Sequence, residues 1–203
     1  MIGKGILCFS LAGIMTMTAD ASQTRSEVVS ARTQTAAVSS GARSARGDQI
    51  RDIELRQLKG MICYLGGKPD HAPILLKAGK KFEIDPLFLA AVTYVESSFR
   101  HRARSGKGAC GLMQLRPIIT KTFGVTDPWD PHQNIMGGAA YLRSCFQRYS
   151  KHSNSTFLAL AAYNVGPGPV KKLNDSQAAK RFVKKVLRVY NRFTDEPIRL
   201  SSR

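Results

Sequence analysis

Residues 82–99 read FEIDPLFLAAVTYVESSF, and after a polar loop residues 108–115 read GACGLMQL. The first segment predicts a helix, because Asp85 can accept hydrogen bonds from free amide groups and Pro86 suits the first helical position. The dozen residues that follow are almost wholly apolar, which indicates a helix buried around most of its circumference. Glu96 stands near its end, with no lysine or arginine within three residues on either side. A buried, unpaired carboxylate is costly unless it stays protonated, as a general acid must.

The composition indicates one domain of ordinary size with a strongly basic surface. The 203 residues include 31 Lys and Arg against 14 Asp and Glu, for a formal net charge of +17. This imbalance favours an anionic partner, and nucleic acid, anionic lipid and a carboxylate-rich cell wall all satisfy it. A basic surface that is simply solvated satisfies it as well.

The N-terminal residues predict export. Lys4 precedes an uncharged apolar run over residues 5–17, and Ala19-Asp20-Ala21 fits a cleavage site, so residues 1–21 are interpreted as a secretory signal peptide. The alternative is a short anchor left uncleaved. Cys8 lies inside the apolar run, which argues against a lipoprotein. No later stretch is long and apolar enough to cross a membrane, so we expect a periplasmic mature chain without a stable membrane span.

The cysteines and histidines do not form a metal-binding pattern. Export leaves Cys63, Cys110 and Cys145, an odd number, which permits one disulfide among three possible pairs. The four histidines are scattered. We therefore expect no metal ion and no cofactor.

The rest of the chain divides by composition. Residues 22–47 are rich in Ser, Thr, Ala and Arg and predict a flexible tether. Residues 48–66 predict an accessory helix with an apolar stripe of Ile50, Ile53, Leu58 and Ile62. Residues 67–195 form the expected catalytic domain, and residues 196–203 a disordered tail.

Within that domain the patterns predict helices over residues 72–82, 117–124, 131–149 and 156–164 and a final helix after Ser176, in addition to the buried one. Asp130, Ser155 and Ser176 are the expected N-caps. Residues 171–179 are expected to be a loop. No pair of strongly alternating strands occurs, so the fold class is mainly α, a single helical domain with at most a small β element.

Several motifs in order resemble the soluble lytic transglycosylase family. They are Glu96-Ser97, residues 108–115, Asn134-Ile135 and residues 162–168, AYNVGPG, with DPWDP at residues 127–131 between them. The resemblance covers about residues 70–190. It implies a goose-type, lysozyme-like α+β fold with an active-site groove.

The resemblance also implies an activity: cleavage of the β-1,4 bond between N-acetylmuramic acid and N-acetylglucosamine in peptidoglycan, leaving a 1,6-anhydromuramyl end. By the same resemblance Glu96 is the sole catalytic acid and base. The implied substrate-binding residues are Ser97, Met113, Gln114, Tyr163, Asn164 and Phe182. At Phe182 many family members have a tyrosine, so one substrate hydrogen bond is missing here.

The local chemistry agrees with a single catalytic carboxylate. Ordinary glycosidases use two carboxylates, but the motifs here supply only Glu96. Asp127 and Asp130 stand before prolines, where turn initiation and helix capping explain them. The competing interpretation of Glu96 is a structural ion pair with Arg100 or Arg102.

Three alternatives to the transglycosylase stay open. One is a muramidase that hydrolyses the same bond, and another is a catalytically silent, basic wall-binding or scaffold protein of a secretion apparatus. The third, a nucleic-acid binder, is disfavoured by export and by the lack of a binding motif. The expected partners are peptidoglycan glycan strands, with a cell-envelope secretion or conjugation machine as a further hypothesis.

Overall fold

A computed structural model describes residues 48–195 and 198 of the chain. The predicted signal peptide, the tether and all of the tail except Ile198 lie outside the described residues. Among those residues, none of the helices combines the length and the apolar character that a membrane span requires.

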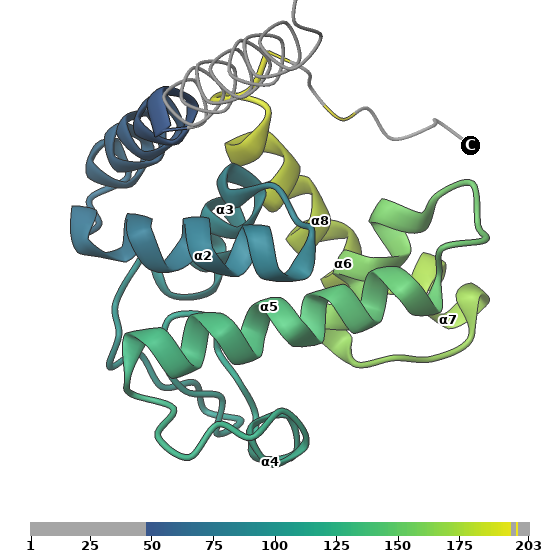
Figure 1. The fold of residues 1–203 in the computed structure, drawn as a ribbon. Coiled ribbons are helices and arrows are strands. Elements are labelled where there is room, and N and C mark those ends of the chain that lie inside the picture. The colour runs from purple at the N-terminus through teal and green to yellow at the C-terminus, as the bar shows by residue number, and fades with distance from the viewer. Residues whose placement is uncertain (1–47, 196–197, 199–203) are drawn as a thin grey trace, which may run out of the picture. The chain divides into compact units, whose positions relative to one another are not determined.

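The described part of the chain is mainly helical, as predicted (Figure 1). After a helix over residues 48–64 and a short 3-10 turn, η1 (Pro69–His71), the elements in chain order are α2 (Ala72–Phe82), α3 (Pro86–Ser97), α4 (Pro117–Thr122), α5 (Pro131–Arg148), α6 (Ser155–Val165), α7 (Val170–Asp175) and α8 (Gln177–Tyr190). The small β element consists of two isolated bridges in the loop between α3 and α4, which pair Cys110 with Arg104 and with Leu115.

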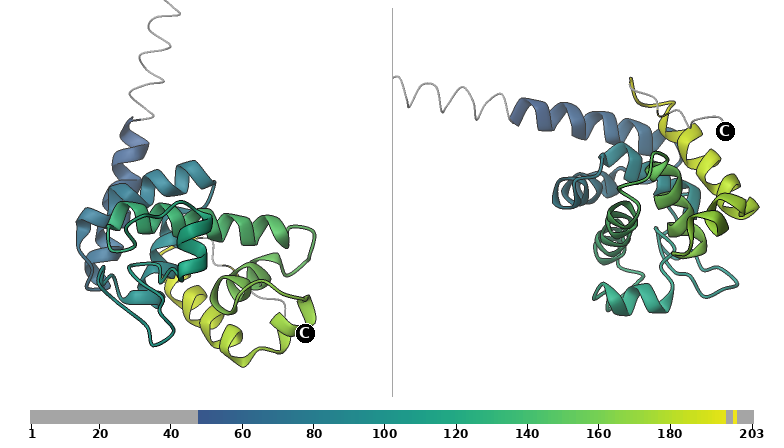
Figure 2. Two further views of the ribbon diagram at one scale, coloured as in Figure 1. Left: turned by 90° about the horizontal axis from the view of Figure 1, so that it is seen from below. Right: turned by 90° about the vertical axis from the view of Figure 1, so that its right-hand side faces the viewer.

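Helix α3 packs against α2 and α8, while α5 packs on α2 and α6 (Figures 1 and 2). Its residues from Phe88 to Thr93 are all buried, which confirms a helix buried around most of its circumference. Asp85 caps the helix by accepting a 2.8 Å hydrogen bond from the Leu87 amide. Asp130 and Ser176 cap α5 and α8 in the same way.

Two local expectations were wrong. Residues 171–179 are not one loop, because α7 occupies most of them and buries Leu173. Ser155 is the first residue of α6 rather than its cap, and the preceding Asn154 makes no side-chain capping bond. The predicted helix before the domain is present over residues 48–64. Of its apolar stripe Leu58 and Ile62 are buried, whereas Ile50 and Ile53 are half exposed.

Candidate active site

Glu96 lies in the last turn of α3, where the backbone then turns sharply. Ser98 and Phe99 adopt left-handed φ angles of 51° and 59°, an unusual conformation for residues other than glycine that often accompanies functional sites. Burial raises the pKa of the Glu96 carboxyl to about 8. Desolvation favours the neutral acid because a low-dielectric environment penalises the charged form.

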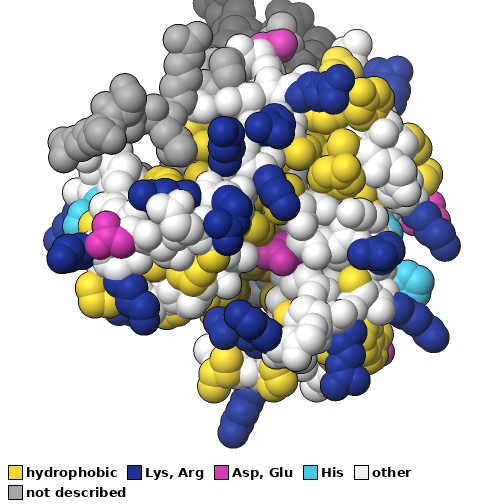
Figure 3. All heavy atoms as spheres, turned by 180° about the vertical axis from the view of Figure 1, so that it is seen from behind, with side chains coloured by type: hydrophobic (Ala, Val, Ile, Leu, Met, Phe, Trp, Pro, Cys, Tyr) yellow, Lys and Arg dark blue, Asp and Glu magenta, His cyan; other side chains and the backbone are white. Residues whose placement is uncertain are grey.

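In the part of the chain that the structure describes, Glu96 has no hydrogen-bonding or ion-pairing partner. Arg100 instead donates from Nε to the Ser97 carbonyl at 3.1 Å, and neither it nor Arg102 forms the ion pair of the competing interpretation. Figure 3 shows lysine and arginine side chains around a hollow on one face, with an acidic side chain inside it. Glu96 is only partly exposed to solvent, and with no cation beside it this desolvation favours the protonated form of the carboxyl group.

The loop that faces the end of α3 is closed on itself. Cys110 and Leu115 exchange backbone hydrogen bonds of 3.0 and 2.9 Å, and the Gly111 amide donates to the Ala103 carbonyl at 2.9 Å. Gln114 has a left-handed φ of 51°, and its side-chain amide nitrogen donates hydrogen bonds to the Ala103 and Gly111 carbonyls. Gln114 was predicted to bind substrate through both its amide nitrogen and its carbonyl oxygen. Only the side-chain carbonyl oxygen remains available for this.

Asn134 ties this loop to α5. The side chain is buried, accepts from the Met113 amide at 2.8 Å, and donates to the carbonyls of Cys110 at 3.0 Å and Pro128 at 2.7 Å. Asn134 belongs to one of the motifs that resemble the family, but no role was predicted for it. The sequence signal that was available is a polar residue in the first turn of a helix, directly before the apolar Ile135. Asn134 therefore positions the loop.

Tyr163 joins α6 to the same loop. Its hydroxyl donates to the Met113 carbonyl at 2.8 Å, so its proton is engaged there and not on Glu96. Its ring lies 5.0 Å from Tyr141 and is stacked on Phe182 at 6.5 Å. The pKa of Tyr163 is raised well above its usual value, mainly by burial and next by the charge of Glu96, which places the two side chains in one electrostatic environment.

The other predicted substrate-binding residues differ in what they leave available. Ser97 is buried and its hydroxyl donates to the Thr93 carbonyl, and Met113 is fully buried, with its sulfur over Gly138. Asn164, the penultimate residue of α6, is half-buried with no side-chain hydrogen bond to any described residue. The structure therefore brings the loop, Tyr163 and Phe182 together, and leaves Asn164 and the Gln114 carbonyl oxygen able to bind a ligand.

The described residues contain no cluster of three His, Cys, Asp or Glu side chains that could hold a metal ion. Cys63, Cys110 and Cys145 are free thiols. The two aspartates near the motifs have the structural roles expected of them. Asp127 accepts from the Trp129 amide in a turn, and Asp130 from the Gln133 amide as a helix cap.

Replacing Gly111 with alanine should disrupt the loop. Gly111 has φ +80°, and a Cβ atom there would lie 2.1 Å from Asn134 Nδ2 and 2.3 Å from the Pro128 carbonyl oxygen. Since one of these atoms belongs to the backbone and cannot swing away, we expect a loss of about 3 kcal/mol or more in unfolding free energy. Gly106→Ala is the matched control, because nothing lies within 4 Å of its Cβ. Equal denaturant midpoints for the two variants would contradict this account of the loop.

Comparison with known proteins agrees with this geometry. Residues 73–186 match the family model of the transglycosylase SLT domain. The chain is 40% identical over 114 residues to a transglycosylase of Enterobacteria phage PRD1, which covers 56% of the chain and 40% of the relative. It is 40% identical over 113 residues to membrane-bound lytic murein transglycosylase F of Hahella chejuensis, covering 54% of the chain and 22% of the relative.

A solved structure shares the fold as well. Lytic transglycosylase Slt of Pseudomonas aeruginosa, solved as an inactive glutamate-to-glutamine mutant, superposes with a TM-score of 0.52 at 31% identity, covering 61% of this chain and 24% of that one. The chain thus spans less than half the length of these relatives. The family match nevertheless extends over more than half of the chain and includes Glu96 and the loop that follows α3, so this protein belongs to the transglycosylase SLT domain family.

Proposed function

We propose that this protein cleaves the β-1,4 bond between N-acetylmuramic acid and N-acetylglucosamine in peptidoglycan and leaves a 1,6-anhydromuramyl end. The observation that carries the proposal is the isolated carboxyl group of Glu96, whose pKa is raised to about 8 by burial alone. Another carboxylate close to it would contribute a charge effect, and none of those in the described part of the chain does. A mechanism that needs one acid and no nucleophilic carboxylate fits this site.

The proposed reaction uses Glu96 twice. The protonated carboxyl donates its proton to the glycosidic oxygen, the bond from that oxygen to C1 breaks, and the N-acetyl oxygen of the muramic acid stabilises C1. The Glu96 carboxylate then takes the proton of the C6 hydroxyl, whose oxygen bonds to C1. No water is consumed, and the enzyme ends as it began. Because the attacking hydroxyl is already part of the substrate, the step gains the advantage of an intramolecular reaction.

The surroundings of Glu96 support this assignment. The Gln114 carbonyl oxygen and the Asn164 amide are suited to acetamido and hydroxyl groups. The net charge of +17 favours a wall polymer whose peptides carry carboxylates. Export to the periplasm, where peptidoglycan is accessible, and service to a secretion or conjugation machine are part of the same proposal.

Mass spectrometry of the products from purified peptidoglycan tests the proposal. We expect muropeptides that are lighter by one water than the products of hydrolysis. A muramidase would instead give reducing ends, and a silent scaffold protein would pellet with the wall and release nothing. Either of these results would reject the proposed reaction.

A further inference from the structure

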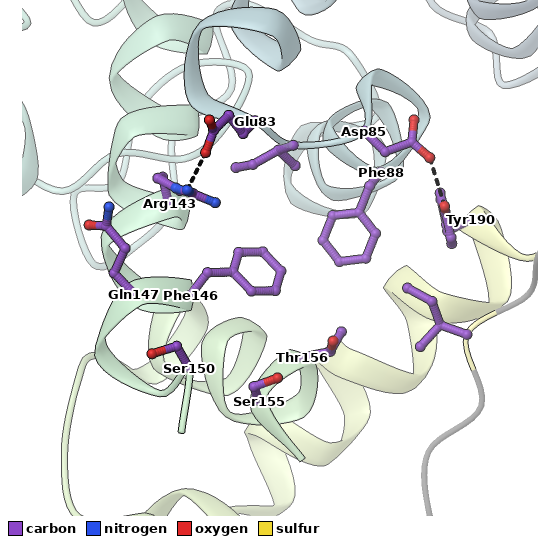
Figure 4. Close-up of a pocket in the computed structure, with 12 residues that line it drawn as sticks. Glu83, Asp85, Phe88, Arg143, Phe146, Gln147, Ser150, Ser155, Thr156 and Tyr190 are labelled. Carbon is purple, nitrogen blue, oxygen red and sulfur yellow. Dashed lines mark hydrogen bonds and ion pairs between the residues drawn. The ribbon is translucent and has the colours of Figure 1, made fainter. Parts of the chain in front are cut away.

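A cavity of about 510 Å³ lies at the opposite end of α3 from Glu96 (Figure 4). It is lined by Asp85, the cap of α3, which precedes Glu96 by roughly 16 Å of helix. The second half of α5, the start of α6 and the end of α8 complete its wall. The candidate active site uses the other ends of these four helices, so a ligand in the cavity leaves that site unobstructed.

The interior of the cavity is aromatic. Phe88, Phe146 and Tyr190 face it from three helices, with Phe88 at 6.0 Å from Phe146 and 5.2 Å from Tyr190 between ring centroids (Figure 4). This space is large enough for the apolar side chains of a short peptide. A leucine side chain buried there would be removed from water, which favours binding.

The edge of the cavity is polar and carries more negative than positive charge. Glu83 pairs with Arg143, and Asp85 accepts a 2.7 Å hydrogen bond from the Tyr190 hydroxyl. The Glu83 side chain is 73% exposed. In a chain with a net charge of +17, two carboxylates against one guanidinium make this edge complementary to a basic segment.

One residue of a peptide segment already lies in the wall. Ile198 lines the cavity, and the Asn191 side chain binds its backbone at both polar groups. Asn191 Nδ2 donates to the Ile198 carbonyl at 2.9 Å, and the Ile198 amide donates to Asn191 Oδ1 at 3.0 Å. A side-chain amide that pairs in this way imitates a neighbouring strand and fixes the direction of the bound backbone.

We propose that the cavity is a peptide-binding site whose ligand is the chain's own segment 198–203, with Leu200 filling the aromatic interior. In an extended segment the side chains of Ile198 and Leu200 point the same way, about 7 Å apart, which is within the reach of the cavity. Arg199 and Arg203 supply the positive charge that its edge complements, and the segment contains no acidic residue.

A binding experiment with the full chain tests this site. The probe is a fluorescently labelled peptide with the sequence of residues 195–203, and the receptor is the variant Ile198→Asp/Leu200→Asp, whose own tail cannot enter. We expect this variant to bind the peptide with a Kd of tens of micromolar, and about tenfold or more weakly once the peptide itself carries Leu200→Asp. The wild-type chain should bind the peptide roughly 20-fold more weakly, because its tethered tail competes at a millimolar effective concentration.

Two results would overturn the proposal. If the tail variant does not bind the peptide, the cavity is not a peptide site. Equal affinity for the wild-type chain and the variant would show that the tail does not occupy the cavity, which would then be open to a segment of another protein.

A thermal measurement gives an independent outcome. Leu200→Asp should lower the melting temperature by about 2–4 °C, because it removes an apolar contact that only the folded chain makes. Ser201→Asp, which adds the same charge at the neighbouring position without removing an apolar side chain, should leave it unchanged. The same melting temperature for both variants would contradict burial of Leu200.

Discussion

Replacing Glu96 with glutamine should lower turnover of peptidoglycan by about 10³-fold or more, because the same carboxyl group must both donate and accept the proton and glutamine does neither. Glutamine matches the protonated glutamic acid in size and shape, and burial leaves that neutral form as the dominant one near neutral pH. The fold should therefore survive the change. Release of soluble muropeptides, measured by chromatography and mass spectrometry, gives the rate.

Glu83→Gln is the matched control. It makes the same chemical change on an exposed side chain at the other end of α3, where Glu83 pairs with Arg143. We expect unchanged muropeptide release from this variant and unchanged pelleting with the wall from both. Substantial release by Glu96→Gln would remove Glu96 from the mechanism and the proposed reaction with it.

The pH dependence of the reaction should follow the same carboxyl group. Since the pKa of Glu96 is raised from 4.5 to about 8, the acid form that starts the reaction persists through neutral pH. We expect kcat/KM to fall tenfold per pH unit above about 8. A decline centred near pH 4 to 5 instead would show that the acid has the pKa of an ordinary carboxyl group, which contradicts the raised pKa of Glu96.

Stability should change with pH in the same range, and its direction follows from proton binding. Between pH 4.5 and about 8 the folded protein holds a proton on Glu96 that the unfolded chain has lost, so unfolding releases a proton. The free energy of unfolding therefore falls as the pH rises through this window, by up to about 1.4 kcal/mol per pH unit. Below pH 4.5 Glu96 is protonated in both the folded and the unfolded state, so it no longer lowers the free energy of unfolding.

Thermal unfolding of wild type and Glu96→Gln across this window measures that penalty. The two melting temperatures should agree near pH 4, and at pH 8 the glutamine variant should be higher by several degrees. Parallel curves at every pH would mean that burial does not perturb this carboxyl group. Because no substrate is present, the experiment tests the environment of Glu96 separately from its role in catalysis.

Local sequence signals predicted the helices where a cap or a proline marked the start. Asp85-Pro86 and Asp130-Pro131 begin α3 and α5 as expected, because a cap and a fixed φ act within a few residues of chain. The prediction failed at α7, because the resemblance to the family implied a loop at residues 171–179. That helix buries Leu173 and packs against α6 and α8, and these contacts depend on how the helices fold against one another.

At the candidate site, too, local features could be predicted from the sequence and contacts made on folding could not. The apolar run around Glu96 predicted its desolvation, and the ordered motifs predicted the family. The hydrogen bonds of Asn134, Gln114 and Tyr163 could not be predicted. Most of their backbone partners in the loop lie 11 to 50 residues away along the chain. The remaining bond of Gln114, to Gly111, spans 3 residues but depends on a left-handed turn. Residue type gives the capacity to donate or accept, whereas the partner depends on folding.

By itself the sequence determined a mainly helical domain, a buried helix with one acid near its end, and a resemblance to the lytic transglycosylase family, because these depend on residue order and local chemistry. Only the tertiary structure decided which polar groups hold the loop and which remain for a ligand. It also revealed the aromatic cavity at the far end of α3, since Phe88, Phe146 and Tyr190 come from three helices and meet only when α3, α5 and α8 pack.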